Sequence, residues 1–163
     1  TNRLVSVIGV SDIVVVETKD SILITKKNHS KKISNIVEKL KNQKREESDI
    51  HTKVYRPWGF YDSIESGDGF QVKKLQVNPG AKLSLQKHHH RSEHWIVISG
   101  EATVICGSNT FQLIKNTSTF IPQGELHRLE NKGTKPLEII EIQTGSYFGE
   151  DDIIRLEDDY QRD

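Results

Sequence analysis

The sequence contains no methionine, a single cysteine and no long apolar run. One cysteine, Cys106, excludes a disulfide within the chain and fits a reducing compartment, so we expect a cytoplasmic protein. The longest apolar runs, such as Ile13 to Val16, are far too short to cross a bilayer, and no basic-then-apolar leader opens the chain. We therefore expect no membrane partner. The absence of methionine agrees with a segment cut from a longer protein, and we expect such a segment.

An excess of charge of one sign is also absent, because 23 basic residues balance 23 acidic ones. Nucleic acids and anionic membranes usually bind surfaces rich in lysine and arginine, so neither is an expected partner. At 163 residues the chain is long enough for one sizeable core, or for one domain with an appendage. A small molecule or another protein is the more natural partner.

The first part of the chain predicts a small set of strands followed by a helix. Residues 4–25 hold β-branched runs broken by turn-forming residues, which predicts two or three short strands. From Ser30 to about Lys44, lysines surround one apolar stripe at helical spacing, which predicts an amphipathic surface helix. The stripe consists of Ile33, Ile36, Val37 and Leu40.

A charged segment without apolar periodicity, Asn42 to Asp49, is the expected linker. We therefore expect two parts, an N-terminal extension over residues 1–50 and a separate domain over residues 51–163. The second part opens with a turn from Arg56 to Gly59 among aromatic residues, which we interpret as an aromatic plug at one end of a barrel. Packing is the preferred role for these aromatic residues over ligand contact.

From Phe70 onward, short apolar stretches recur with glycine, asparagine and proline between them. This pattern predicts an all-β sandwich or barrel. The expected strands are residues 70–77, 83–88, 95–98, 102–106, 111–114, 119–121, 126–129 and 137–142. In the second of them, Leu83 and Leu85 share one face while Gln86 and His88 share the other. Polar side chains that face a cavity need a chemical reason.

Four side chains could converge at this face: Gln86, His88, Glu93 and His127. Glu93 follows a short polar bend, from His89 to Ser92, that returns the chain. Two imidazoles, an amide oxygen and a carboxylate suit a divalent ion, with zinc preferred and manganese, cobalt, nickel or iron as alternatives. The other interpretation is a buried hydrogen-bonded cluster without metal. Because a carboxylate buried among imidazoles is costly without a compensating charge, we predict the metal site.

The chain resembles the cupin family at two motifs. The first, with glutamine where most cupins have their first histidine, consists of Gly80, Gln86, His88, Glu93 and Gly100. The second consists of Pro122, Gly124, His127 and Asn131. Asn116 stands where the second motif usually opens with glycine. The resemblance implies a jelly-roll barrel.

More narrowly, residues 51 to the end resemble the C-terminal cupin of the type II phosphomannose isomerases, on VYRPWGFYDSIESGDGF, FIPQGELHRLEN and GSYFGEDDIIRLEDDY among other stretches. Residues 1–50 more weakly resemble the tail of the guanylyltransferase domain that precedes this cupin. The resemblance implies metal-dependent interconversion of mannose 6-phosphate and fructose 6-phosphate, within a bifunctional protein that also makes GDP-mannose from mannose 1-phosphate and GTP. It further implies a homodimer, a missing N-terminal guanylyltransferase domain and a role in surface polysaccharide synthesis.

Such an isomerisation moves a proton between C1 and C2 through an enediolate, so the site needs an oxyanion stabiliser, a general base and a phosphate-binding group. For the phosphate we favour Arg91, with Arg128 and Lys82 as alternatives, because arginine offers a bidentate fork. Arg91 could instead stabilise the enediolate. His90, His94 or a metal-bound water could act as the base.

Two other functions stay open. A cupin that only supports dimerisation or stability of a guanylyltransferase would keep the fold without turnover. A different cupin enzyme, such as an iron dioxygenase, would more often show a third histidine in place of Gln86. No glycine-rich nucleotide loop with a basic signature occurs in the sequence, so guanylyl transfer is not expected within this segment.

Overall fold

The computed structural model describes residues 6–18, 21–43, 52–157 and 160. The chain divides into two compact units, Thr1–Thr52 and Lys53–Asp163. No helix within these described ranges is long and apolar enough to span a membrane.

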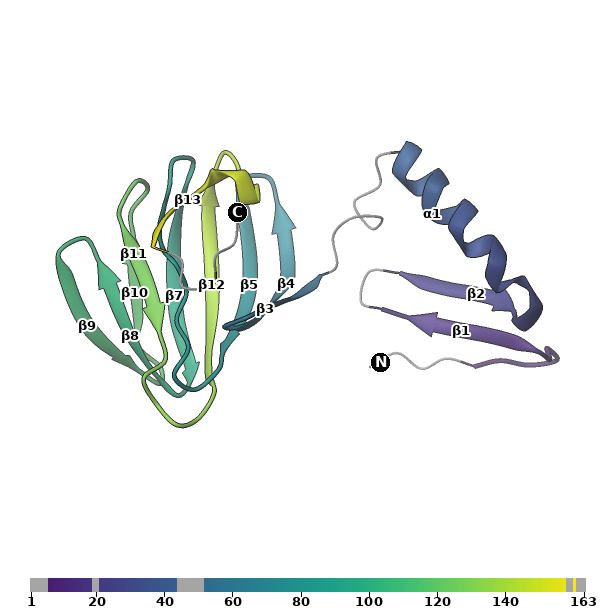
Figure 1. The fold of residues 1–163 in the computed structure, drawn as a ribbon, viewed down its shortest axis with the longest axis horizontal. Coiled ribbons are helices and arrows are strands. Elements are labelled where there is room, and N and C mark those ends of the chain that lie inside the picture. The colour runs from purple at the N-terminus through teal and green to yellow at the C-terminus, as the bar shows by residue number, and fades with distance from the viewer. Residues whose placement is uncertain (1–5, 19–20, 44–51, 158–159, 161–163) are drawn as a thin grey trace. The chain divides into compact units, whose positions relative to one another are not determined.

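The first unit contains a hairpin and one helix (Figure 1). Strand β1 (Ile13–Glu17) pairs antiparallel with β2 (Ile22–Lys26), and a 3-10 turn, η1 (Lys27–Lys32), leads into α1 (Ile33–Asn42). The predicted short strands and amphipathic helix are confirmed. The helix begins later than expected because its first turn is 3-10, as is frequent at helix N-termini.

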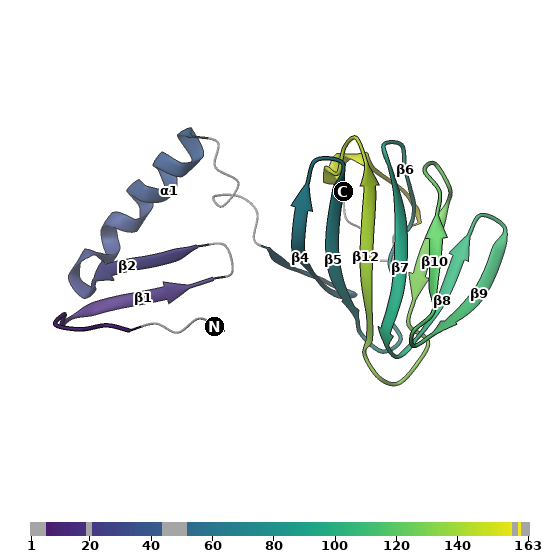
Figure 2. The same ribbon diagram turned by 180° about the vertical axis from the view of Figure 1, so that it is seen from behind.

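Two antiparallel sheets make up the second unit, with strand orders β10-β7-β12-β5-β4-β3 and β13-β6-β11-β8-β9. The first sheet contains β3 (Lys53–Arg56), β4 (Gly59–Gly67), β5 (Phe70–Val77), β7 (Arg91–Ser99), β10 (Ser118–Ile121) and β12 (Leu137–Gly145). The second contains β6 (Leu85–His88), β8 (Glu101–Cys106), β9 (Asn109–Ile114), β11 (His127–Glu130) and β13 (Ile153–Glu157). Figure 2 shows β12 between β5 and β7. The all-β prediction is confirmed, although neither sheet closes on itself as a barrel would.

The buried faces of β12 and β7 change from apolar to polar along the length of each strand. In β12 the buried residues run from Leu137 and Ile139 to Glu141 and Gln143. The neighbouring β7 follows the same course, since its buried residues run from Val97 and Trp95 to Glu93 and Arg91. The register sets Ile139 opposite Val97 and Gln143 opposite Glu93. The interior of this unit is therefore apolar at one end and polar at the other.

Every strand predicted from Phe70 onward is observed; β5 has the predicted ends and the others have shifted ends. Strand β6 begins at Leu85, two residues later than predicted. Leu83 lies before the strand, and its backbone N–H donates a hydrogen bond to the carbonyl of Leu129. Strict alternation therefore does not apply to Leu83, which lines the same cavity as Gln86. Asn116 has φ 68°, a left-handed conformation that asparagine tolerates better than most residues, which explains how it can replace glycine there.

Three strands were not predicted. The segment interpreted as an aromatic plug forms the hairpin of β3 and β4, in which Trp58 is buried in the core and Tyr55 is exposed. The acidic tail contributes β13, which pairs with β6 and sets Arg155 opposite Gln86. Apolar alternation is weak in that tail, so the formation of β13 depends more on its pairing with β6 than on its own sequence pattern.

Candidate metal centre

The predicted ligands come from three strands of the second unit. His88 ends β6, Glu93 is the third residue of β7, and His127 begins β11. The bend between β6 and β7 is shorter than predicted, since Arg91 already begins β7. Pairing of β11 with β6 sets His127 directly opposite Gln86. Chain segments that are far apart in sequence are thereby joined at the polar end of the interior.

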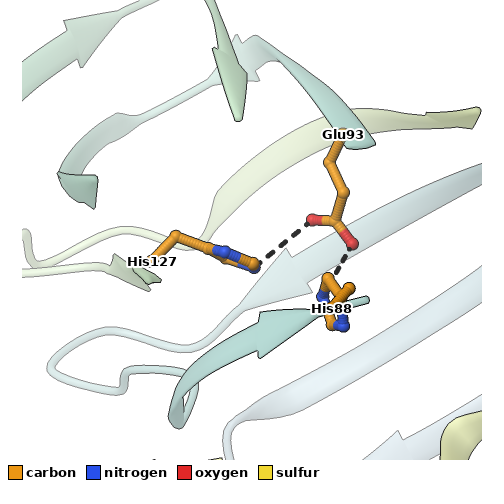
Figure 3. A group of neighbouring side chains, drawn as sticks. All are labelled: His88, Glu93 and His127. Atoms are coloured by element: carbon orange, nitrogen blue, oxygen red, sulfur yellow. Dashed lines mark ion pairs between the residues drawn. The ribbon is translucent and has the colours of Figure 1, made fainter. Parts of the chain in front are cut away.

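The side chains of His88, Glu93 and His127 point toward one another (Figure 3). His88 Nε2 lies 3.1 Å from Glu93 Oε1, and His127 Nε2 lies 3.7 Å from Glu93 Oε2. One ligand atom from each residue lies within 4.8 Å of the others. Metal bonds to nitrogen and oxygen of about 2.0–2.2 Å suit atoms at this separation. The cluster can therefore hold a divalent ion.

Three of the four imidazole nitrogens of this cluster lack a hydrogen-bond partner within the described part of the chain. Among the described residues, His88 Nδ1, His88 Nε2 and His127 Nε2 are buried without one. His127 Nδ1 lies 2.8 Å from the backbone carbonyl of Glu125, which can only accept, so Nδ1 carries the hydrogen and Nε2 offers a lone pair. Burial lowers the pKa of His127 although the Glu93 charge acts to raise it. A neutral imidazole with a free lone pair is the form that binds a metal.

Glu93 is held as an oriented carboxylate. Its Oε2 accepts a hydrogen bond from Trp95 Nε1 and its Oε1 accepts one from Gln143 Nε2, each over 3.0 Å. Burial acts to raise the pKa of Glu93, but contact with His88 and the charge of Arg91 act against it, and the pKa is lowered overall. These neighbours keep the group ionised and fix its direction, as outer partners of metal ligands commonly do.

Gln86 lies beside this cluster. It lines the same cavity as Glu93, and its Oε1 accepts a hydrogen bond from Ser84 Oγ over 2.9 Å. The amide therefore faces the polar end of the interior, as predicted from its alternation with His88.

The cavity next to the cluster has a volume of about 60 Å³. That space accommodates several water molecules, at about 10–15 Å³ for each. Its polar lining includes Gln86, Arg91 and Glu93 from the predicted set. Further polar and charged residues of the lining are Arg56, Tyr61, Lys73, Ser84, Glu141, Gln143, Glu150 and Arg155.

None of these additional residues was among the predicted site residues. Glu141 lies within the predicted strand 137–142 and Gln143 one residue beyond it, and alternation from Leu137 points both inward, so both could have been found. Burial, together with the charge of Glu93, raises the pKa of Glu141 to about 8. Glu150 and Arg155 lie in the tail, where the sequence carries no comparable signal.

Arg91 begins β7, although it was predicted to lie in the preceding bend. It is buried and lines the cavity, with Nε 3.6 Å from Glu93 Oε1. Its Nη1 donates a hydrogen bond to the carbonyl of Gly149 over 3.1 Å and lies 3.4 Å from Asp152 Oδ2. Within the described part of the chain, Arg91 Nε has no hydrogen-bond partner. One donor of this guanidinium is thus still available near Glu93.

The other predicted catalytic and substrate residues lie outside the cavity lining. His94 is exposed on the outer face of β7, with its ring centroid 6.4 Å from that of Phe120. The side chain of His90 is 56% exposed, and its Nδ1 lies 2.8 Å from Asp152 Oδ1.

Arg128 follows His127 in β11 and therefore faces away from the cluster. Its Nη2 lies 2.6 Å from Glu157 Oε2, and its Nη1 lies 3.8 Å from Glu130 Oε1. Lys82 forms an isolated bridge with Glu130 and does not line the cavity either. Of the three predicted phosphate ligands, the structure brings only Arg91 to the cavity.

Two family models match this chain. The model described as "Mannose-6-phosphate isomerase C-terminal" matches residues 42–158, and the one described as "MannoseP isomerase/GMP-like beta-helix domain" matches residues 1–40. The family resemblance inferred from the sequence motifs is thus supported by matches that cover residues 1–40 and 42–158.

Several bacterial proteins are similar to this chain over nearly its whole length. The chain is 58% identical over 160 residues to the alginate biosynthesis protein AlgA of Pseudomonas aeruginosa, covering 98% of this chain and 33% of that protein. It is 48% identical over 159 residues to the mannose-1-phosphate guanylyltransferase ManC of Salmonella typhimurium, with 98% and 33% covered. The chain spans about one third of the length of these relatives.

Solved structures share the fold. A structure of Bacillus subtilis oxalate decarboxylase, a protein with Mn(II) centres, matches with a TM-score of 0.58 at 22% identity, over 65% of this chain and 30% of that one. The cupin domain of Schizosaccharomyces pombe Cnp3 matches with a TM-score of 0.50 at 17% identity, over 53% of this chain and 64% of that one. At such identities the likeness shows the fold alone, and the predicted cupin fold is confirmed.

Proposed function

Because the chain belongs to the mannose-6-phosphate isomerase C-terminal family, we propose that its second unit interconverts mannose 6-phosphate and fructose 6-phosphate with the help of a divalent metal. The convergence of His88, Glu93 and His127 beside a cavity with cationic lining residues carries this proposal. An aldose-ketose isomerase needs both features, since it must stabilise an enediolate and hold a phosphate.

The proposed ligands are Gln86, His88, Glu93 and His127. A divalent ion held there, zinc first among the candidates, would act as a Lewis acid that polarises the sugar oxygens. The protein itself contributes the orientation of the ligands: Gln143 and Trp95 fix the Glu93 carboxylate, and the Glu125 carbonyl fixes the His127 tautomer.

Arg91 is proposed to act on the bound sugar. Its guanidinium is buried at the polar end of the interior, where a fixed positive charge stabilises a developing oxyanion far better than it would in water. Its free Nε is the donor available for this task. His94 faces away from the cavity and His90 is held at its exterior by Asp152, so neither position supports the role of general base.

We also propose that residues 1–50 are the tail of a mannose-1-phosphate guanylyltransferase domain. The match of residues 1–40 to a separate family model and the name of the Salmonella relative support this assignment. The complete protein would then also make GDP-mannose, as a cytoplasmic homodimer that supplies polysaccharide synthesis. A cupin that only stabilises the guanylyltransferase is the alternative.

A coupled assay of mannose 6-phosphate to fructose 6-phosphate on this chain tests the proposal. Chelation should abolish turnover, and one of the candidate metals should restore it. The variant His88→Ala should stay inactive with every metal, while His94→Ala, an exposed histidine on the outer face, is the matched control and should remain active. Absence of turnover with all of the metals would favour the non-catalytic alternative.

A further inference from the structure

The carboxylate of Glu150 is held at the cavity by three donors from other elements. Its Oε1 accepts a hydrogen bond from the Tyr61 hydroxyl over 3.3 Å and lies 3.5 Å from Arg56 Nη2. Its Oε2 accepts one from Arg155 Nη2 over 3.3 Å. Glu150 lies in the 3-10 turn η3 (Glu150–Asp152), whereas the donors come from β3, β4 and β13. Two strands of one sheet and the edge strand of the other thus converge on a single anion.

This convergence lies at the mouth of the cavity that contains Glu93. All four residues line it, and the Glu150 side chain is 50% exposed, against 29% and 26% for Arg56 and Arg155. The two arginine side chains are therefore more buried than the carboxylate between them. Two guanidinium groups and a phenol form a pocket of donors that is open toward solvent on the side occupied by Glu150.

Positive charge dominates this mouth. Lys73 also lines the cavity, with Nζ 4.9 Å from the centroid of the Tyr61 ring, and Arg56 Cζ lies 5.6 Å from the same centroid. Burial acts to raise the pKa of Glu150, but the charges of Arg56, Lys73 and Arg155 outweigh it and lower the pKa. One carboxylate thus faces three cations, which leaves room for an anion of higher charge.

We propose that Arg56, Arg155 and Tyr61 form the binding site for the phosphate group of the substrate, and that the Glu150 carboxylate fills this site until the phosphate displaces it. This inference rests on the proposed isomerase function and names the part of the site that selects a phosphorylated sugar. A phosphate dianion carries more charge than a carboxylate and offers three acceptor oxygens, so two arginine forks bind it more strongly.

Displacement of Glu150 needs only a side-chain rotation. The turn that carries Glu150 is anchored by Asp152, which is buried and accepts a hydrogen bond from the backbone N–H of His89 over 3.0 Å. Asp152 also lies 3.4 Å from Arg91 Nη1. The backbone of the turn is thereby held to the bend that follows His88, while the half-exposed Glu150 side chain can swing into solvent.

This assignment replaces the phosphate ligands predicted from sequence. Arg128 pairs with Glu157 and Glu130 on the opposite face of β11, away from the cavity. Arg91 lies deeper in the cavity than the Glu150 cluster, since its side chain is 2% exposed. One arginine would then act on the reacting carbons while two others hold the distant phosphate.

Isothermal titration calorimetry, with inorganic phosphate added to the metal-free chain, tests the site without any need for turnover. Arg155→Gln and Arg56→Gln should each weaken phosphate binding at least about tenfold, because each removes a charge-assisted hydrogen-bonding group. Glu150→Gln should act in the opposite direction and tighten binding severalfold, since it removes the competing charge. Arg128→Gln and Glu157→Gln, a matched pair outside the cavity, should leave binding unchanged.

The expected change in phosphate affinity has opposite signs in the arginine variants and in Glu150→Gln. If an arginine variant fails to fold, Glu150→Gln still tests the site, because it changes only one half-exposed side chain. Unchanged or weaker phosphate binding in Glu150→Gln would overturn the proposal. Phosphate binding that requires added metal and is unchanged in Arg155→Gln would also overturn the proposal. In the isomerase assay, Arg155→Gln should raise KM with little change in kcat. If the parent chain does not turn over with any of the metals while the phosphate titrations follow the expected order, the proposed function fails and the anion site stands.

Discussion

Gln143 donates a hydrogen bond from Nε2 to Glu93 Oε1 over 3.0 Å. The two residues are paired across β12 and β7, so the sheet register itself sets the amide beside the carboxylate. The same Nε2 donates to Glu141 Oε2 over 2.9 Å. Gln143 therefore links a proposed metal ligand to a second buried carboxyl group, although no sequence motif marked it.

Replacing Gln143 should weaken metal binding without unfolding the protein. Gln143→Leu removes the donor that orients Glu93, and loss of such an outer partner typically costs about 10–100-fold in metal affinity. Competition with a chelating dye measures the effect. Gln112→Leu, on the exposed β9 where Gln112 bonds to Thr103, is the control and should keep full affinity. Equal affinity in both variants would exclude an orienting role for Gln143.

Removal of either imidazole should strip the metal and leave the sheets intact. His88→Ala and His127→Ala each delete a buried nitrogen that has no hydrogen-bond partner in the described part of the chain. Metal content after dialysis should fall to background, while the far-ultraviolet circular dichroism spectrum stays that of a β protein. His94→Ala should retain its metal. Full metal retention in both cluster variants would refute the site.

Arg91→Ala should abolish turnover without loss of metal. Arg91 lies between Glu93 and Asp152, and breaking a buried ion pair commonly costs about 3–5 kcal/mol, so a lower free energy of unfolding is also expected. Arg91→Lys keeps a charge and serves as the second variant, with lower kcat because a lysine cannot reproduce the fork. Normal kinetics in Arg91→Ala would remove this residue from the mechanism.

The shared face of Gln86 and His88 could be predicted because its signal is local. Gln86 and His88 are two residues apart in one strand, so strand alternation turns them to one face. Glu93 lies in a strand of the other sheet, and His127 reaches the cluster through the pairing of β11 with β6, so their approach depends on the fold. His94 illustrates the same rule from the other side. If Glu93 points inward then His94 points outward, so strand alternation would have excluded His94 from the site.

The mouth of the cavity could not be predicted, because it depends on pairings between distant segments. Arg155 reaches the cavity only through the pairing of β13 with β6, and its own strand has little apolar alternation. Arg56 was noticed beside an aromatic turn, but nothing in that turn reveals that Glu150 lies 3.5 Å away. Long-range contacts of this kind are set by topology more than by sequence pattern.

The buried carboxyl of Glu141 should make the stability of the metal-free chain depend on pH. Its folded pKa, raised to about 8 by burial and by Glu93, lies above the ordinary value of 4.5. Between these values the folded state binds more protons than the unfolded state, so the contribution of Glu141 to stability is complete below about pH 4.5 and is lost as the pH rises toward 8. Glu141→Gln keeps the shape and the acceptor for Gln143 and removes the ionisation.

Chemical denaturation in the presence of a chelator should therefore show the parent chain losing stability relative to Glu141→Gln from about pH 5 to pH 8, by about 3–4 kcal/mol in total. The gap should level off above pH 8, where the carboxyl is ionised in both states. Glu138→Gln, on the exposed side of the same strand where Glu138 pairs with Lys74, is the control and should show no such growing gap. A pH-independent difference between the parent and Glu141→Gln would mean that Glu141 ionises normally in the fold, and that the polar end of the interior admits enough water to solvate its charge.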